Sequence, residues 1–428
     1  VLATSLAARY RPRFPVTLAG RRKTKNQISS GTCAPGPAIS NSYNSDQHFP
    51  VIADPKSMRG SEPKQASFTI FVSIEEMVAK RLPAAHPLRV IKAAADEILR
   101  RMSPDMDALY AKDGRPSIPP ELMLRSLLWQ ALYSIRSETQ LVERLEFDMM
   151  ARWFVGLPLD CSAWDHSTFS ANRAHLRLPI LMETFFQAQL EFLREKGLLS
   201  DQHLSVDGSL IQAWASQKSL VKRADLDADG KPPAPPAGGR NPFVDFKGTK
   251  RSNATHVSAT DPDARLASKG NGSKIAHELS ILTENRNNFV VGVEIRSPAS
   301  SKSERDAAAK LVERQVREGR TPRTVGADKA YADGDDLVLA LDNMGVQAHF
   351  SARDDRPEAL ARVFHDDPGF SVSIKKRMRI EEVFGYIKTV AGMAQVKVRG
   401  HINVLSASTL ALTAYNFAHF ATLSSDAQ

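Results

Sequence analysis

The sequence predicts an all-helical N-terminal domain, residues 75–198, followed by an α/β domain, residues 200–425, whose sheet is mixed. Two observations lead to this fold class. Apolar residues recur at helical spacing between residues 85 and 197, where strand signals are almost absent. From residue 203 onwards, short apolar runs rich in β-branched residues alternate with helical patterns, which is the element order of an α/β domain. A chain of 428 residues accommodates both domains and a tail.

The N-terminal helices begin at recognisable start signals. Pro87 suits the first turn of one helix. Ser137 and Gln140 have capping-box spacing at the start of another. Asp165 or Ser167 is expected to cap the helix that runs through "TFSANRAHLRLPILMETFFQAQLEFLREKG".

The second domain contains five predicted strands. The pattern is three strands, a helix, a strand, a helix, a strand and then helices. The expected strands are "HLSVDGSLI" from residue 203, "KIAHELSILT", "NFVVGVEIR", "RTVGADKA" and "VQAHFS". The turn "ENRNN" between the second and third predicts a hairpin. The helices are expected in "SERDAAAKLVERQVREG", "DGDDLVLALDNM", "KKRMRIEEVFGYIKTV" and "VLSASTLALTAYNFAHFATL".

Two segments are predicted to lack regular structure. Residues 1–60 are interpreted as a disordered basic tail, because residues 1–27 hold seven Arg or Lys and no acid. An organellar transit peptide is the alternative interpretation of that composition. Residues 213–273 are rich in Pro, Gly and Lys and lack an apolar period, so they predict a flexible basic insertion.

Net charge favours a polyanionic partner. The formal charge is +9 and the pI is near 9.5. A merely basic globular protein without such a partner is the alternative. The sequence has no run of about eighteen apolar residues, so a membrane-spanning helix and a membrane partner are not expected.

Two aspartates follow predicted strands that we expect to be neighbours. Asp207 ends the first strand and Asp328 follows the fourth. A helical crossover implies a parallel strand, and chemistry in such sheets gathers at the carboxyl ends of central strands. Glu381, on a helix packed across that edge, would complete a cluster of three acids. Three converging acids repel one another unless cations lie between them, and all-oxygen ligands favour Mg²⁺ or Mn²⁺. Two such ions, about 4 Å apart, suit phosphodiester chemistry.

Glu382 is the rival for the third acid, because it adjoins Glu381 in the sequence. On one helix, Arg377, Glu381 and Lys388 would share a face, whereas Glu382 would be rotated by roughly 100°. Ile380, Phe384 and Ile387 would form the packed side. We therefore favour Glu381.

Several motifs resemble those of DDE transposases from bacterial insertion sequences. The spacing of Arg377, Glu381 and Lys388 resembles the Arg–Glu–Lys part of the YREK-type signature. "LSVDGSLI" and "VGADKAYADGD" look like the motifs of the first and second Asp, and "AWDHSTFSANR" is similar to a motif of the N-terminal helical domain. "DPDARLASKGNG" and "LTENRNNFVVG" match the IS-five-like group. The tyrosine of the signature falls on Ile374, so any role of that tyrosine is absent here.

The resemblance implies an RNase H-like catalytic domain preceded by a helical DNA-binding domain. It makes Asp207, Asp328 and Glu381 the catalytic acids and metal ligands, for two Mg²⁺ or Mn²⁺ ions. Basic residues near them are expected to contact DNA phosphates. They are Arg377 and Lys388 by the signature, together with Lys329, Lys375, Lys376 and Arg379.

The implied function is DNA transposition. The protein would hydrolyse phosphodiesters at the ends of its element and transfer the freed 3′-hydroxyl into target DNA. Its partners would be double-stranded DNA, as terminal inverted repeats and target, and a second copy of the chain, because two ends must be joined. The location expected is the cytoplasm, in association with the nucleoid. The alternatives are another RNase H-like DNA endonuclease and a catalytically silent or domesticated derivative that only binds DNA.

Overall fold

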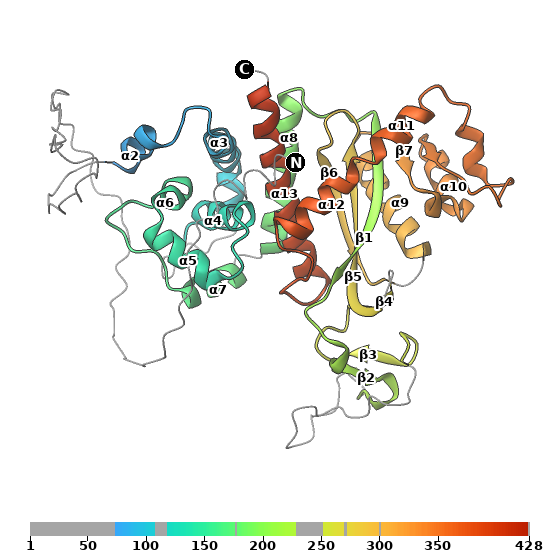
Figure 1. The fold of residues 1–428 in the computed structure, drawn as a ribbon, viewed down its shortest axis with the longest axis horizontal. Helices are drawn as coiled ribbons and strands as arrows, with labels where there is room; N and C mark the ends of the chain where they lie inside the picture. Colours follow the sequence, from blue (N-terminus) through green and yellow to red (C-terminus); the bar gives the residue numbers. More distant parts are fainter. Residues whose placement is uncertain are drawn as a thin grey trace, which may run out of the picture.

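The computed structural model describes residues 73–107, 118–175, 178–227, 251–268, 272–298 and 301–426. The predicted tail at residues 1–60 lies outside them. A group of helices forms the N-terminal part, and a six-stranded sheet with helices on both faces forms the C-terminal part (Figure 1). The predicted fold class is therefore confirmed.

The N-terminal helices are α2 (Ile74–Arg81), α3 (Pro87–Asp107), α4 (Pro120–Leu132), α5 (Glu138–Phe147), α6 (Met149–Val155), α7 (His166–His175) and α8 (Leu178–Glu195). Three of them, α3, α5 and α7, begin at their predicted start signals, whereas the one helix predicted from residue 168 to 197 is described as two, α7 and α8. The Ser137 hydroxyl caps α5 by accepting the Gln140 N–H at 3.2 Å. The Asp165 carboxylate, not Ser167, caps α7: it accepts the Ser167 N–H at 2.8 Å. Capping satisfies backbone donors that have no partner within the helix.

The C-terminal part follows the predicted order of elements. Its strands are β1 (His203–Gln212), β2 (Leu220–Lys222), β3 (His256–Ser258), β4 (Arg265–Ser268), β5 (Ser273–Glu284), β6 (Val290–Arg296), β7 (Thr324–Ala327) and β8 (Gln347–Phe350). Its helices are α9 (Ser301–Arg317), α10 (Asp335–Asn343), α11 (Phe370–Arg377), α12 (Ile380–Thr389) and α13 (His401–Asp426). The short 3₁₀ turns are η1 (Gln217–Ser219), η2 (Arg223–Asp225), η3 (Lys329–Ala332) and η4 (Leu360–Phe364).

The main sheet has the order β4-β5-β1-β7-β8, and β6 pairs with the later part of β5. β1 is antiparallel to β5 and parallel to β7, which is in turn parallel to β8. Three antiparallel strands followed by two parallel ones is the RNase H-like arrangement that the resemblance implies. The β5–β6 hairpin is also confirmed. The Glu284 carboxylate stabilises its turn by accepting the N–H groups of Arg286 and Asn287.

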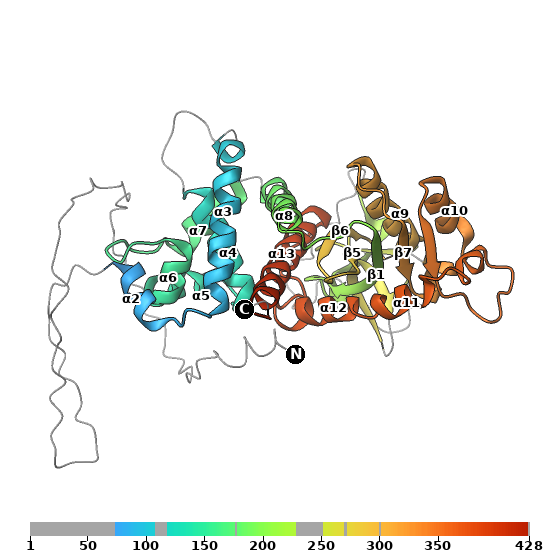
Figure 2. The same ribbon diagram turned by 90° about the horizontal axis from the view of Figure 1, so that it is seen from above.

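Helices cover both faces of the sheet. α9 and α10 lie on one face, and α11 and α12 lie on the other (Figure 2). α11 approaches β7 closely at Gly326, where a Cβ would lie 3.4 Å from the Ser205 hydroxyl and 3.6 Å from the Ser373 carbonyl oxygen. A glycine at this position lets the helix pack directly on the strand.

α13 lies between the two parts of the chain (Figure 1). Its Asn416 side chain bonds both backbone groups of Val290 in β6, at 3.0 and 2.9 Å. On the opposite side, Gln189 of α8 donates to the Thr413 carbonyl at 3.0 Å. One continuous hydrophobic core runs through the helical part, α13 and the sheet. None of the helices in the described ranges is long and apolar enough to cross a membrane.

The prediction that residues 213–273 lack regular structure is wrong where the structure describes them, while their flexibility stays a prediction. Within residues 213–227 and 251–268, β2 pairs with β3 and β4 extends the edge of the main sheet beside β5. Strands of three or four residues carry too few positions for a period to be visible in the sequence. Residues 228–250 and 269–271 lie outside the described residues.

Candidate active site at the carboxyl ends of β1 and β7

The parallel pairing of β1 with β7 sets Asp207 level with Asp328. The last paired residues are Ser205 and Gly326, and each aspartate lies two residues further along its own segment of chain. β7 ends at Ala327, whereas β1 continues to Gln212, so the prediction that Asp207 ends the first strand is wrong: only the part of β1 that pairs with β7 ends before it. The Asp328 carboxylate accepts the Ala330 N–H at 2.9 Å and so caps η3. The sequence prediction that these two strands are parallel neighbours is confirmed.

Asp207 and Asp328 line a common cavity of about 530 Å³. Two further acids line it, Glu278 from β5 and Glu304 from α9. A side chain at Gly208 would fill part of this space. Its Cβ would lie 3.4 Å from the Tyr331 hydroxyl, 3.7 Å from that of Ser280 and 3.8 Å from Oε1 of Glu304. The glycine therefore keeps the floor of an acidic cavity open. Glu278 and Glu304 carried no motif that sequence reasoning could have used, whereas Tyr331 lies within "VGADKAYADGD" and was given no role there.

Glu278 is the most buried of these acids, with 3% of its surface exposed. Its Oε2 accepts the Ser303 hydroxyl at 2.8 Å. Its Oε1 is buried without a hydrogen-bond partner in the described structure, as is the Tyr331 hydroxyl. Burial raises the pKa of Glu278 to about 7. Burial, followed by the nearby carboxylates with Asp207 first, raises the pKa of Tyr331. Both orphaned groups mark a cavity built for a polar occupant.

Arg377 of α11 and Lys388 of α12 both reach β1. Nη1 of Arg377 lies 4.0 Å from Oδ2 of Asp207, and their side chains are 18% and 20% exposed. The Lys388 ammonium donates to the Ser209 hydroxyl, two residues further along the same strand face. Through these two contacts, α11 and α12 lie over the part of β1 that carries Asp207.

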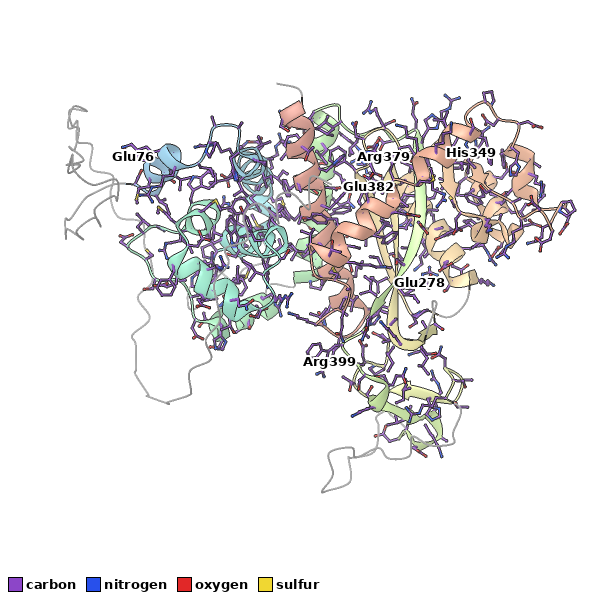
Figure 3. All side chains as sticks on the ribbon, in the orientation of Figure 1. Glu76, Glu278, His349, Arg379, Glu382 and Arg399 are labelled. Carbon is purple, nitrogen blue, oxygen red and sulfur yellow. The ribbon has the colours of Figure 1, made fainter. Side chains whose placement is uncertain are left out.

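Glu381 and Glu382 are both exposed on α12. Glu381 does not line the acidic cavity. Glu382 lies on the side of α12 that faces α13, because its charge contributes to raising the Tyr415 pKa after the larger effect of burial. Figure 3 shows Glu382 near Arg379 and away from Glu278.

The predicted continuous helix is interrupted between α11 and α12. Met378 and Arg379 keep helical dihedrals but do not belong to either helix. The chain here makes i→i+3 bonds, from Arg379 N to Lys376 O and from Glu382 N to Arg379 O, both at 3.0 Å. A 3₁₀ turn advances by about 20° more per residue than an α-helix. The angle between Glu381 and Arg377 around the helix axis therefore differs from that of one ideal helix.

The other basic residues of the predicted DNA contact lie around this site. Lys329, in η3 directly after Asp328, is exposed, as are Lys375 and Lys376 on α11. Arg379 lies on the other side, towards α13, where it contributes to lowering the His419 pKa after the larger effect of burial. Lys329 therefore adjoins an acid of the site, whereas Arg379 lies towards α13.

The donors present have the chemistry that a hard divalent cation requires. Asp207, Asp328 and Glu304 supply carboxylate oxygens at one cavity, and Glu278 adds a buried oxygen without a partner. Within the ranges that the structure describes, however, no three His, Cys, Asp or Glu side chains converge as a ready metal-binding group. The donor set fits Mg²⁺ or Mn²⁺, and a third ligand would have to move towards the two aspartates.

Glu278→Gln is expected to increase stability at neutral and alkaline pH. A carboxyl group whose pKa rises on folding binds its proton more tightly in the folded state, so its stabilisation is lost as pH rises from about 4.5 to about 7. The variant keeps an acceptor for Ser303 and removes this loss. Its gain over the parent should grow by roughly 2–3 kcal/mol between pH 5 and pH 8 in urea unfolding. Glu143→Gln, at an exposed position of α5, is the control. An equal effect of Glu278→Gln at both pH values would contradict an ionising buried carboxyl.

Family models match both parts of the chain. Residues 76–175 match the transposase domain (DUF772). Residues 253–417 match the transposase DDE domain. The chain carries a DDE transposase domain. The match contains Asp328 and Glu381 and begins after Asp207.

Similarity to solved structures is weak. The structure titled "Mos1 transposase paired-end complex with left transposon end" covers 66% of this chain and 82% of its own, at 12% identity and a TM-score of 0.18. A "Mos1 mariner paired end complex with Mn" covers 75% of this chain and 91% of its own, also at 12% identity and a TM-score of 0.18. TM-scores this low support no conclusion about the site or its chemistry. No curated protein matches the sequence.

Proposed function

We propose that this protein is a DNA transposase of the IS-five-like group that cleaves the ends of its element and transfers the 3′-hydroxyl into target DNA. Two transposase family matches support this, one in each part of the chain. The register that sets Asp207 level with Asp328 is the structural observation that carries it. Two carboxylates that line one cavity where the β1–β7 pairing ends are suited to phosphoryl transfer on a polyanion.

Asp207, Asp328 and Glu381 are the proposed catalytic acids and ligands of two Mg²⁺ or Mn²⁺ ions. When bound, such ions would activate the attacking water or 3′-hydroxyl and stabilise the leaving oxygen. Glu381 is favoured over Glu382 because α12 is anchored to β1 at Ser209, whereas Glu382 faces α13. A small rotation of the 3₁₀ turn at 378–379 would bring Glu381 towards the aspartates.

The basic side chains have a separate role in this proposal. Arg377 neutralises Asp207 in the absence of substrate, and its Nε is buried without a hydrogen-bond partner in the described structure. A DNA phosphate would satisfy that donor. Lys388 would exchange the Ser209 hydroxyl for a phosphate, and Lys329, Lys375 and Lys376 would bind neighbouring phosphates. Arg379 is the least suited of the set, given its position towards α13.

The partners follow from the reaction. Helices α5 to α7 would recognise the terminal inverted repeats in a helix-turn-helix-like arrangement. Joining two ends calls for two copies of the chain, so we propose a homodimer in the active complex. The reaction would take place in the cytoplasm, at the nucleoid.

A strand-transfer assay tests this function. The full chain is incubated with Mg²⁺, a labelled duplex that carries one end of the element, and a supercoiled plasmid. Covalent joining of the label to the plasmid is expected. Cleavage of the duplex without joining would favour an RNase H-like endonuclease instead. Binding of the duplex without cleavage, in Mg²⁺ and in Mn²⁺, would favour a silent derivative.

A further inference from the structure

The β2–β3 lobe, residues 213–227 and 251–268, projects from the end of the sheet (Figure 1). It contains a pocket of about 200 Å³. Two arginines line the pocket, Arg223 of η2 and Arg265 at the start of β4. The other lining residues are Leu226, Val257, Ser258, Ala259 and Pro262. Two guanidinium groups therefore share one small, otherwise largely apolar pocket.

Backbone carbonyls, not acids, hold both arginines in place. Nε of Arg223 donates to the Asn253 carbonyl at 3.1 Å. Nη1 of Arg265 donates to the carbonyls of Pro262 and of Ala264, the latter at 3.1 Å. Neither arginine forms an ion pair with an acid in the ranges that the structure describes. Their positions are thus fixed while their charges are left without a described counter-ion.

The acids closest to Arg265 are already engaged. Asp261 is fully buried, and its Oδ2 lies 2.9 Å from Nε2 of His277 while its Oδ1 accepts the Gly400 N–H at 3.2 Å. Asp263 accepts the His401 N–H at 2.9 Å. Both carboxylates hold the start of α13 against the lobe. Burial, and then the charge of Arg223, lowers the Arg265 pKa despite these acids. The charge of Arg223 therefore opposes that of Arg265, and Asp261 and Asp263 offset this repulsion only in part.

An anion with several oxygens would relieve this repulsion. Arginine presents a planar fork of donors that matches phosphate geometry, and it is weakly hydrated compared with lysine. β4 connects the pocket to the acidic cavity: Arg265 lines the pocket, and Leu266, Ala267 and Ser268 line the cavity. Three residues of strand span about 10 Å, which is roughly three nucleotide steps along a DNA duplex.

We propose that Arg223 and Arg265 clamp one backbone phosphate of duplex DNA on the β2–β3 lobe, about three nucleotides from the acidic cavity. This inference rests on the proposed function in so far as duplex DNA is the substrate. The clamp would hold the duplex without reading its sequence, because phosphate contacts position DNA and carry no base information. It would also explain why the lobe is attached through a strand of the catalytic sheet.

The test uses the full chain in EDTA, so that binding is measured without cleavage. Fluorescence anisotropy with a duplex of arbitrary sequence is recorded from 50 to 200 mM salt for Arg223→Gln, Arg265→Gln and the control Arg317→Gln. Arg317 is 71% exposed on α9 and loses the same charge. Each lost phosphate contact should flatten the slope of log K against log salt by about 0.9 and reduce affinity about eightfold at 0.1 M salt. The control Arg317→Gln should change the salt slope and the affinity by less than these amounts.

Further measurements exclude simple unfolding of the lobe and free phosphate as the ligand. Arg223→Lys keeps the charge and should retain most of the salt slope; a loss as large as that of Arg223→Gln would overturn the clamp. The clamp would also be overturned if Arg223→Gln and Arg265→Gln changed the salt slope and the duplex affinity no more than Arg317→Gln does.

Inorganic phosphate should compete with the duplex only weakly. Phosphate that stabilises the parent but not Arg265→Gln, with duplex affinity unchanged, would assign the pocket to a free anion and overturn the proposal. If the arginine variants bind the duplex more weakly but the parent protein never cleaves DNA, the clamp is supported and only the proposed function is wrong.

Discussion

Asp328→Asn is expected to abolish cleavage of an element-end duplex while leaving DNA binding within twofold of the parent. The side-chain amide oxygen can still accept the Ala330 N–H that caps η3, so the local fold is preserved. What is lost is the negative charge that a divalent cation needs. The rate should fall by on the order of a thousandfold, measured as nicking of a labelled duplex in Mg²⁺.

Two further variants make this test specific. Asp207→Asn should have a similar effect, because the two carboxylates are level across the β1–β7 pair. Asp342→Asn, at an exposed position of α10, removes the same charge from the surface and should cleave like the parent. If Asp328→Asn cleaved like Asp342→Asn at any Mg²⁺ or Mn²⁺ concentration, the assignment of Asp328 would be wrong.

Glu381→Gln is expected to reduce cleavage by at least a hundredfold, whereas Glu382→Gln should be mild. The two residues are adjacent and both exposed, so each substitution removes one charge from the same helix with little effect on packing. Their difference lies in direction, because Glu382 faces Tyr415 and His419 of α13. Cleavage in Mg²⁺ and duplex affinity in EDTA are measured for both variants.

The outcome decides how α12 is oriented in the active state. A large loss in Glu382→Gln with near-normal Glu381→Gln would mean that the helix is rotated the other way. If both substitutions have mild effects, Glu304 and Glu278, the other acids of the cavity, become the candidates for the third metal-binding acid. Loss of duplex affinity in either variant would contradict a metal-binding role, since removal of an acid should not weaken contact with phosphates.

Local sequence signals determined most of the elements and their order. The capping residues Ser137 and Asp165, the "ENRNN" turn and the β-branched runs each act over a few residues, so they are visible without tertiary information. Asp207 and Asp328 could be paired in advance as well. The helical crossover before β7 requires a parallel neighbour, and Asp328 directly follows β7, although Asp207 lies in the middle of β1 and not at its end.

Only the tertiary structure could place the other groups of the site. Glu278 and Glu304 meet the aspartates because β5 pairs with β1 and α9 packs over that pair, and neither contact leaves a local mark in the sequence. The same holds for Arg223 and Arg265, which lie far apart in the chain and converge through the β2–β3 pairing.

The segment that carries the Arg–Glu–Lys spacing shows most directly what could not be predicted from the sequence. Its residues determined that it would be helical and that Ile380, Phe384 and Ile387 would be buried, as they are. Its phase across Met378 and Arg379 was decided by packing: α11 lies on β7 at Gly326, while α12 is held at β1 through Lys388. A tighter turn between α11 and α12 allows both contacts to form. It adds about 20° per residue, which changes the angle between Glu381 and Arg377 around the helix axis. Spacing in a sequence determines which residues share an ideal helix face, but contacts at both ends determine how that helix is wound.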